Sequence, residues 1–184
     1  MVRVTCCGRV DRVRTVIPDP PPAEFEALLE RRRRSRADTH DEIWEGVYHV
    51  TPAPSMAHAL IVAQLAELLG PPARAARLAY SAEFNLGESD DFRVPDLGLH
   101  RDPLPGIWHP TAALVVEVIS PGDETWDKLR FYANRHVDEL LIVDPQERVV
   151  DWRALQQGEY RPTRRSRLIE LGPAELVERI DWPQ

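Results

Sequence analysis

Two carboxylates stand in apolar stretches of this sequence, where a charged side chain needs a partner. Asp96 lies within a stretch of strand character, and Glu117 interrupts the apolar run from Leu114 to Ile119. A carboxylate in such a run must be neutralised, bound to a metal ion or paired with one of the many arginines. If the two stretches form adjacent strands, Asp96 and Glu117 share one edge of a sheet and can bind a divalent cation. Their oxygens suit Mg²⁺ or Mn²⁺, and Mg²⁺ commonly takes only one or two carboxylates.

Lys128 is the one lysine of the chain, and the other members of its 23 Lys+Arg residues are arginines. A lysine ammonium is a compact charge that can meet a single oxygen or water, whereas an arginine is a wide planar fork. Beside a metal-bound water that attacks phosphorus, such an ammonium would orient the water or neutralise charge. The alternative is an i,i+4 pair with Glu124 on a solvated helix face, worth only about 0.3–0.5 kcal/mol.

Composition and charge limit the partners that the chain can take. With 184 residues and a net charge of −7, the chain does not have the charge of a tight non-specific DNA binder, because phosphate contacts dominate such affinity. Bound divalent cations would cancel acidic ligands locally, so nucleic acid remains a candidate substrate. The adjacent Cys6 and Cys7 lack the spacing of a zinc site and favour a reducing, cytoplasmic setting. The longest apolar stretch, residues 57–69, is too short to span a membrane.

The pattern of elements predicts a single domain over residues 23–184, preceded by a flexible arm over residues 1–22 that lacks the apolar core of a cleavable signal. Apolar periodicity predicts the alternating helices and strands of an α/β fold, with an N-terminal strand pair and a C-terminal hairpin. Helices are predicted over residues 22–34, 55–69 and 123–135, and the second is expected to end at Gly70-Pro71-Pro72. Strands are predicted over residues 42–51 (a pair around Gly46), 74–86, 93–100, 112–119, 139–143, 148–155 and 160–163.

The predicted helix 123–135 would position Lys128 near the two carboxylates. Ser120 followed by Pro121 signals the entry to this helix, whose positive end would then face an anionic phosphate. Three aromatic residues of the helix are expected in the core: Trp126, Phe131 and Tyr132.

Several pieces of the sequence match one known family in order and spacing. The pieces are EIWEG (42–46), PSMAH (54–58), Pro95-Asp96, VVEVISP (115–121), Asp127-Lys128 with Tyr132, VDELLIVDP (137–145) and Gly158-Glu159-Tyr160. Together they resemble the Uma-two family, a large bacterial group described as restriction endonucleases of the PD-(D/E)XK superfamily. No single piece is specific, whereas their order and spacing are, over roughly residues 23–182.

The resemblance implies a restriction-endonuclease-like core with a mixed central β-sheet flanked by helices, in which Asp96 and Glu117 are the metal ligands. The superfamily's usual lysine stands two residues after the glutamate, a place that Ile119 holds here. In this family the lysine moves to the following helix, where Lys128 stands.

Two further residues are candidates for the same site. The resemblance places His58 near it, although a lone histidine at the start of a helix is more often a cap or a surface residue. Glu42 is a candidate for a further carboxylate, directed at the metal or at Lys128.

The hypothesis from the sequence is a Mg²⁺- or Mn²⁺-dependent endonuclease that hydrolyses DNA phosphodiester bonds. Asp96 and Glu117 would bind the metal, Lys128 would stand beside the attacking water, and a homodimer is expected. A hypothesis of a different class is a catalytically silent nucleic-acid-binding or assembly module of the same fold. A third is a metal-dependent hydrolase of another phosphoester.

Overall fold

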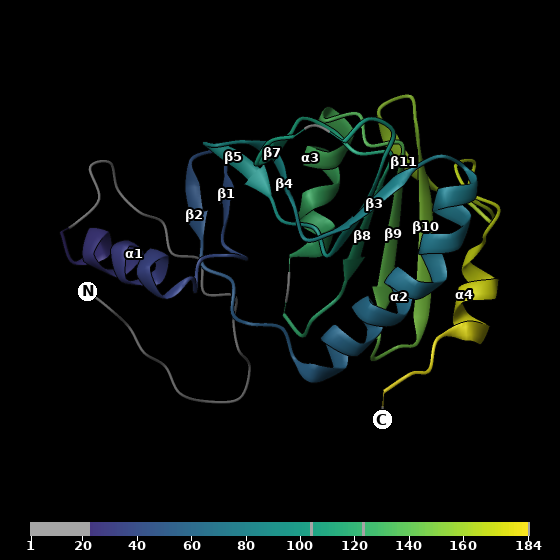
Figure 1. The fold of residues 1–184 in the computed structure, drawn as a ribbon, viewed down its shortest axis with the longest axis horizontal. Coiled ribbons are helices and arrows are strands. Elements are labelled where there is room, and N and C mark those ends of the chain that lie inside the picture. Colours follow the sequence, from purple (N-terminus) through teal and green to yellow (C-terminus); the bar gives the residue numbers. More distant parts are fainter. Residues whose placement is uncertain (1–22, 104, 123, 184) are drawn as a thin grey trace.

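The computed structural model describes residues 23–183 except 104 and 123, and within them the strands form two sheets (Figure 1). The predicted arm, residues 1–22, lies outside the described residues. The main sheet has the strand order β11-β10-β9-β8-β6-β3, and the smaller one has the order β2-β1-β5-β4-β7. The main sheet consists of β3 (Ala79–Ala82), β6 (Leu97–His100), β8 (Leu114–Val118), β9 (Glu139–Asp144), β10 (Val149–Gln156) and β11 (Glu159–Pro162). The smaller sheet consists of β1 (Glu42–Trp44), β2 (Val47–His49), β4 (Asn85–Glu88), β5 (Asp91–Arg93) and β7 (Trp108–His109).

The main sheet is mixed, as predicted. Its central strands β8 and β9 run parallel, and its other neighbouring strands are antiparallel. All five residues of β8 are buried, including Glu117. A strand that is covered on both faces reads as a continuous apolar run, and this explains why β8 and β9 were predictable from sequence.

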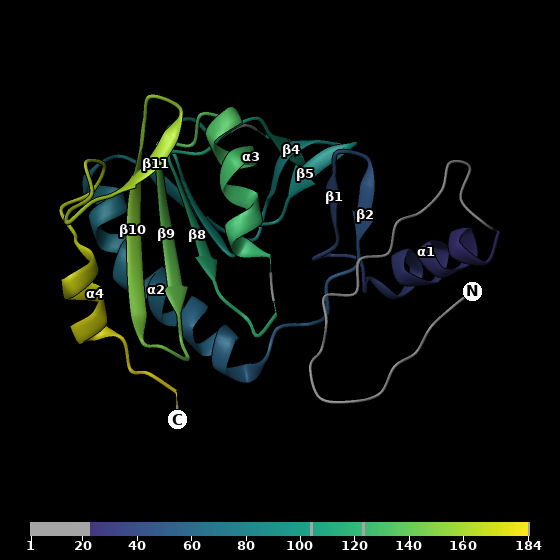
Figure 2. The same cartoon turned by 180° about the vertical axis from the view of Figure 1, so that it is seen from behind.

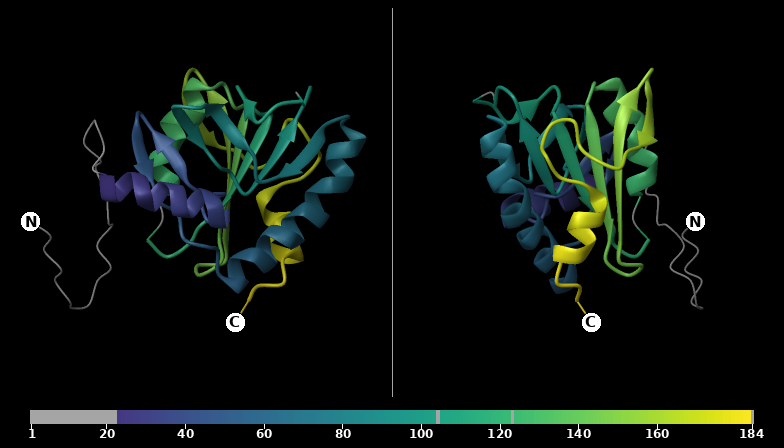
Figure 3. Two further views of the ribbon diagram at one scale, coloured as in Figure 1. Left: turned by 60° about the vertical axis from the view of Figure 1, so that its left-hand side comes forward. Right: turned by 90° about the vertical axis from the view of Figure 1, so that its right-hand side faces the viewer.

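Helices cover the two faces of the main sheet unequally, as the right-hand view of Figure 3 shows. The helices α2 (Met56–Ala75) and α4 (Pro173–Arg179) pack on one face, where the core includes Leu65, Val116, Leu141, Trp152 and Leu176. The other face is covered by α3 (Leu129–Asn134), which Figure 2 shows in front of the strands. This second core is smaller, and α3 has only six residues.

The N-terminal strand pair was predicted correctly, and it forms β1 and β2 of the smaller sheet. Glu45 and Gly46 join the two strands with φ angles of 49° and 81°, the left-handed pair that a tight hairpin requires. The preceding helix, α1 (Ala23–Ser35), contains no buried residue and lies beside this pair, away from the main sheet (Figure 1).

Two predicted boundaries were wrong. The second helix does not end at Gly70, because α2 continues through Pro71 and Pro72 to Ala75. Ala73 is fully buried, so core packing in the last turn offsets the hydrogen bonds that prolines cannot donate. The strand predicted over 74–86 is therefore replaced by the end of α2 and by the two strands β3 and β4.

The predicted helix 123–135 is also different in the structure. A 3₁₀ turn, η1 (Thr125–Lys128), comes first, and the α-helix α3 begins only at Leu129. Gly122 has a φ of 81° and Glu124 has a non-helical ψ of 24°, so the chain turns before either element begins. The expectation of a helix entry at Ser120-Pro121 is therefore wrong, because the first helical turn among the described residues begins at Thr125.

Candidate active site

The sheet register brings Asp96 and Glu117 together. Strands β6 and β8 are antiparallel, with Leu97 opposite Val116. One residue further along, Asp96 comes opposite Glu117, and directly opposed residues project from the same face of a sheet. The backbone N–H of Val118 donates to Asp96 Oδ2 over 2.7 Å, which fixes Asp96 against the end of β8.

Lys128 lies between two buried carboxylates. Its Nζ is 2.9 Å from Glu42 Oε1 and 3.2 Å from Glu117 Oε1. The Lys128 side chain is 13% exposed, so the solvated pair with Glu124 that sequence left open is not what the structure contains. Tyr132, one turn further along, donates its hydroxyl to the same Oε1 of Glu117.

Glu42 is held so that it faces the ammonium. Its Oε1 accepts from the backbone N–H of Val94 over 2.8 Å, and its Oε2 accepts from the Trp44 indole over 2.6 Å. Both Glu42 oxygens therefore have protein donors in addition to Lys128. This arrangement suits a residue that positions Lys128 better than one that ligates a metal.

His58 approaches Asp96 from helix α2. Its Nε2 is 2.8 Å from Asp96 Oδ1, and its Nδ1 is 3.1 Å from Ser120 Oγ. The cap of α2 is Ser55, whose side chain accepts from the His58 backbone N–H. Of the alternatives that the sequence left open for His58, the structure contains the one in which its ring joins the candidate site.

Burial and neighbouring charges set the protonation of this cluster. Burial raises the pKa of Glu117 to about 7, with Asp96 and Glu42 adding to the rise and Lys128 opposing it. Burial by itself lowers the pKa of Lys128, but the nearby carboxylates outweigh it and raise that pKa above its ordinary value. Burial also raises the pKa of Tyr132, so its hydroxyl stays protonated and donates to Glu117.

The carboxylates fit a hard divalent cation, although they do not form a complete cage. Among residues 23–183 without 104 and 123, no group of three or more His, Cys, Asp or Glu side chains is arranged to hold a metal ion. Glu117 is 5% exposed, and its Oε2 accepts no hydrogen bond from any described residue. A carboxylate oxygen without a protein donor is a ready ligand for Mg²⁺, which keeps several waters and needs few protein ligands.

Two residues that surround these groups, Tyr132 and Arg93, had no role at the site predicted from the sequence. Tyr132 was expected only in the core, yet its hydroxyl reaches Glu117. The i,i+4 spacing from Lys128 to Tyr132 was the available signal, because it places both residues on one helical face. Arg93 had no sequence signal, and it is 4% exposed between the rings of Trp44 and Phe131, at 4.5 and 4.0 Å.

Comparisons with known proteins identify a family and a similar fold. The model of the Uma2 family, described as "Putative restriction endonuclease", matches residues 22–179. The fold is similar to the crystal structure of a "putative nuclease belonging to DUF820" from Anabaena variabilis, with a TM-score of 0.61 and 16% identity. That match covers 75% of this chain and 89% of the other, and at this identity it shows the fold alone. No curated protein matches the chain.

Proposed function

This chain belongs to the Uma2 family, and from that premise we propose that it is a metal-dependent endonuclease that hydrolyses DNA phosphodiester bonds. The observation that carries the proposal is the buried Lys128, shared between Glu42 and Glu117 at the end of β8 where Asp96 also lies. Ionisable groups with perturbed pKa values gather at functional sites, and this supports an active site at the end of β8.

Asp96 and Glu117 are the residues that would hold Mg²⁺ or Mn²⁺. Such an ion, when bound, lowers the pKa of a water and neutralises charge on a phosphate. In the reaction, a water oxygen bonds to phosphorus, one P–O ester bond breaks, and a proton passes to the departing sugar oxygen. The products are a phosphate monoester and a free hydroxyl.

The remaining side chains orient these groups. Lys128 keeps its proton in the neutral range and stands where its ammonium can meet the attacking water or a phosphate oxygen. Glu42 holds Lys128, and Tyr132 holds Glu117. His58 is a positioning residue, because its ring joins Asp96 to Ser120 and so fixes the orientation of the Asp96 carboxylate.

The test of this proposal is cleavage of plasmid and linear DNA by the purified chain with Mg²⁺, Mn²⁺ or EDTA. Cleavage is expected with either cation and not with EDTA. Lys128→Ala is expected to reduce the rate by about 10²-fold or more, on the scale of a lost proton-transfer or charge-stabilising group. Lys128→Arg is expected to fail as well, because a planar guanidinium fork does not replace a compact ammonium held between two carboxylates.

Arg130→Ala is the matched control, since Arg130 lies two residues from Lys128 in the chain and is exposed. The control is expected to retain full activity. Lys128→Arg with full activity would contradict the role given to the ammonium. A wild-type chain that binds DNA but cleaves none under any of these conditions would instead favour the silent binding module. The homodimer expected from sequence is part of the same proposal, and light scattering of the purified chain tests it.

A further inference from the structure

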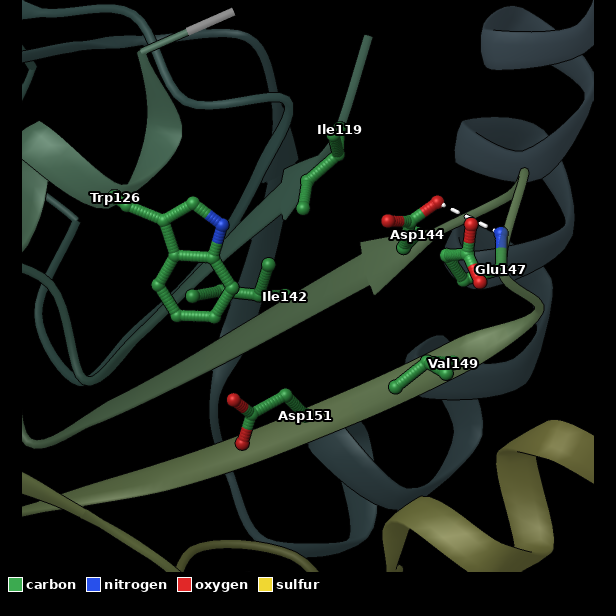
Figure 4. Close-up of a pocket in the computed structure, with 7 residues that line it drawn as sticks. All are labelled: Ile119, Trp126, Ile142, Asp144, Glu147, Val149 and Asp151. Carbon is green, nitrogen blue, oxygen red and sulfur yellow. Dashed lines mark hydrogen bonds between the residues drawn. The ribbon is translucent and has the colours of Figure 1, made fainter. Parts of the chain in front are cut away.

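A shallow pocket lies on the half of the main sheet that α3 leaves uncovered. The short α3 packs over Val115 and Leu140, and the same face then continues past the end of the helix. There a pocket of about 220 Å³ is lined by Ile119, Trp126, Ile142, Asp144, Glu147, Val149 and Asp151 (Figure 4). Trp126 was expected in the core, but it is 48% exposed and forms one wall of this pocket.

The pocket adjoins the candidate active site through the strand register. Glu117 pairs with Ile142 across β8 and β9, and Ile142 pairs with Asp151 across β9 and β10. These three side chains therefore lie in one row on the same face of the sheet. Ile119 follows Glu117 by two residues on that face, and Trp126 precedes Lys128 by two residues in η1. If a phosphate of a nucleic acid strand lay at Glu117, the neighbouring nucleotide of that strand would lie beside this pocket.

The lining combines an apolar floor with hydrogen-bond acceptors. Apart from the indole N–H of Trp126, its polar side chains are carboxylates, and Figure 4 shows Trp126 at one end with Asp144 and Glu147 at the other. Asp144 Oδ1 accepts from the backbone N–H groups of Gln146 and Glu147, and its Oδ2 accepts from no described residue. Such a lining repels phosphate and suits a flat, apolar ligand that carries N–H donors.

Arg153 fixes the wall of the pocket on the side of Trp126. Its guanidinium lies 5.1 Å from the centre of the indole ring and donates to Asp151 Oδ2 at 2.9 and 2.8 Å. Asp151 Oδ1 accepts from no described residue, so it remains available to a ligand. The aromatic surface and the acceptor are therefore held in place before any ligand arrives.

We propose that this pocket receives one unpaired base of the substrate strand and prefers bases with an exocyclic amino group. The inference rests on the proposed function and names its substrate class. Bases stack on exposed aromatic rings whatever their identity, and carboxylates select amino donors such as that of cytosine. Thymine presents carbonyl oxygens where cytosine presents its amino group, so the carboxylates disfavour it. Because unstacking a paired base costs a few kcal/mol, single-stranded or locally unpaired DNA is the preferred substrate.

The test measures the binding of fluorescein-labelled 12-mers of dC and of dT by anisotropy, with Ca²⁺ or EDTA in place of Mg²⁺. The wild-type chain is expected to bind the dC 12-mer more tightly than the dT 12-mer. Trp126→Ala is expected to weaken binding of the dC 12-mer by about tenfold, the scale of one lost base–aromatic stack, whereas Trp126→Phe retains most of it. Asp151→Asn and Asp144→Asn are expected to reduce the preference for dC over dT without abolishing binding.

The matched control is Trp108→Ala, because Trp108 is also exposed but lies in β7 of the smaller sheet, where it packs against Phe92. This variant is expected to bind both 12-mers like the wild type. Unchanged binding and base preference in Trp126→Ala, with the fold intact by circular dichroism, would overturn the base pocket and leave the pocket to another occupant, such as a second copy of the chain.

The binding measurement and the cleavage assay together separate the two proposals. Base-selective binding that depends on Trp126, without cleavage in Mg²⁺, would support the pocket and contradict the nuclease. Cleavage that depends on Lys128 and is indifferent to Trp126 and to the neighbouring base would support the nuclease and contradict the pocket.

Discussion

Glu139 and Glu117 are both buried carboxylates on adjacent strands of the main sheet, at opposite ends of the β8–β9 ladder. Glu139 pairs with Leu114 and is 1% exposed, and Glu117 pairs with Ile142 and is 5% exposed. Each lies within or at the edge of an apolar run, so their sequence settings are similar. Their surroundings in the fold are opposite.

Glu139 is surrounded by neutral donors. Its Oε2 accepts from the Trp152 indole at 2.9 Å and from the Ser166 hydroxyl at 2.6 Å, and its Oε1 accepts from the backbone N–H of Arg167 at 2.7 Å. These bonds join the segment after β11 to the sheet. A buried carboxylate whose two oxygens both have donors is a structural residue, and it leaves no oxygen for a ligand.

Glu117 has a different set of partners. Its Oε1 accepts hydrogen bonds from both the Lys128 ammonium and the Tyr132 hydroxyl. Its Oε2 accepts a hydrogen bond from no described residue. It also lies close enough to Asp96 and Glu42 for their charges to raise its pKa. Burial alone therefore does not distinguish the two glutamates, and the functional role proposed for Glu117 rests on its unengaged oxygen beside a buried cation and further carboxylates.

The largest expected difference between the two glutamates is in the cleavage rate of their glutamine variants. Glu117→Gln is expected to lower the rate of Mg²⁺-dependent DNA cleavage by about 10²-fold or more, because the amide is a poor metal ligand and carries no charge. Glu139→Gln is expected to keep the wild-type rate per folded molecule. Cleavage rates on one supercoiled plasmid, corrected for the folded fraction by circular dichroism, provide the measurement. Equal losses in the two variants would remove the distinction.

Lys128→Ala is expected to have the largest effect on stability. The change leaves Glu42 and Glu117 buried without their cation, and such a loss costs about 3–5 kcal/mol of unfolding free energy. The exposed control Arg130→Ala is expected to change it by less than about 0.5 kcal/mol. Urea unfolding at pH 7.5 in EDTA measures both variants. A loss as small as that of a surface ion pair would show that Lys128 is solvated.

Glu117→Gln is expected to be the more damaging variant for the cleavage rate, whereas Glu139→Gln is expected to be the more damaging one for the free energy of unfolding. Glu139→Gln turns an amide N–H₂ toward donors that then lack an acceptor, at a cost of about 2–3 kcal/mol. Glu117→Gln removes a partly protonated, buried carboxylate and is expected to stay within about 1 kcal/mol of the wild type in EDTA. Urea unfolding at pH 7.5 tests this order, and a greater loss from Glu117→Gln would contradict it.

The smallest expected effect is the pH dependence that Glu117 gives to stability. Its pKa in the folded chain, about 7, is above its ordinary value of 4.5, so the folded state binds a proton more readily than the unfolded state. Stability from this group is full at pH values below the ordinary pKa and is lost as pH rises through 7. Between pH 6 and 8 the wild type is expected to lose about 1 kcal/mol relative to Glu117→Gln in EDTA. Parallel unfolding free energies for the two proteins across this range would contradict the raised pKa.

The sequence predicted the features that depend on local pattern. The strands β8 and β9 follow from continuous apolar runs, and the strand pair β1–β2 follows from the turn at Gly46. Glu117 was identified as a candidate because a charged side chain in an apolar strand needs a partner or a bound ion to offset its burial. Local pattern alone did not place Glu42 or His58 at the site, because the contacts they make cross many residues of sequence.

The features that the sequence did not predict depend on tertiary packing. Pro71 and Pro72 remain helical because the last turn of α2 buries Ala73. Trp126 and Tyr132 were both expected in the core, which is correct for Tyr132 and wrong for Trp126, because the 3₁₀ turn before α3 has three residues per turn and changes the phase of the helical pattern. Trp126 is therefore exposed, while Tyr132 is buried against Glu117.

The most direct test of the central claim is to locate Mn²⁺ in crystals of the wild-type chain by its anomalous scattering. One strong peak is expected in contact with the carboxylates of Asp96 and Glu117, and that peak is expected to be lost in Glu117→Gln crystals soaked in the same way. A strong peak elsewhere, or no peak at these carboxylates at a saturating Mn²⁺ concentration and neutral pH, would contradict it.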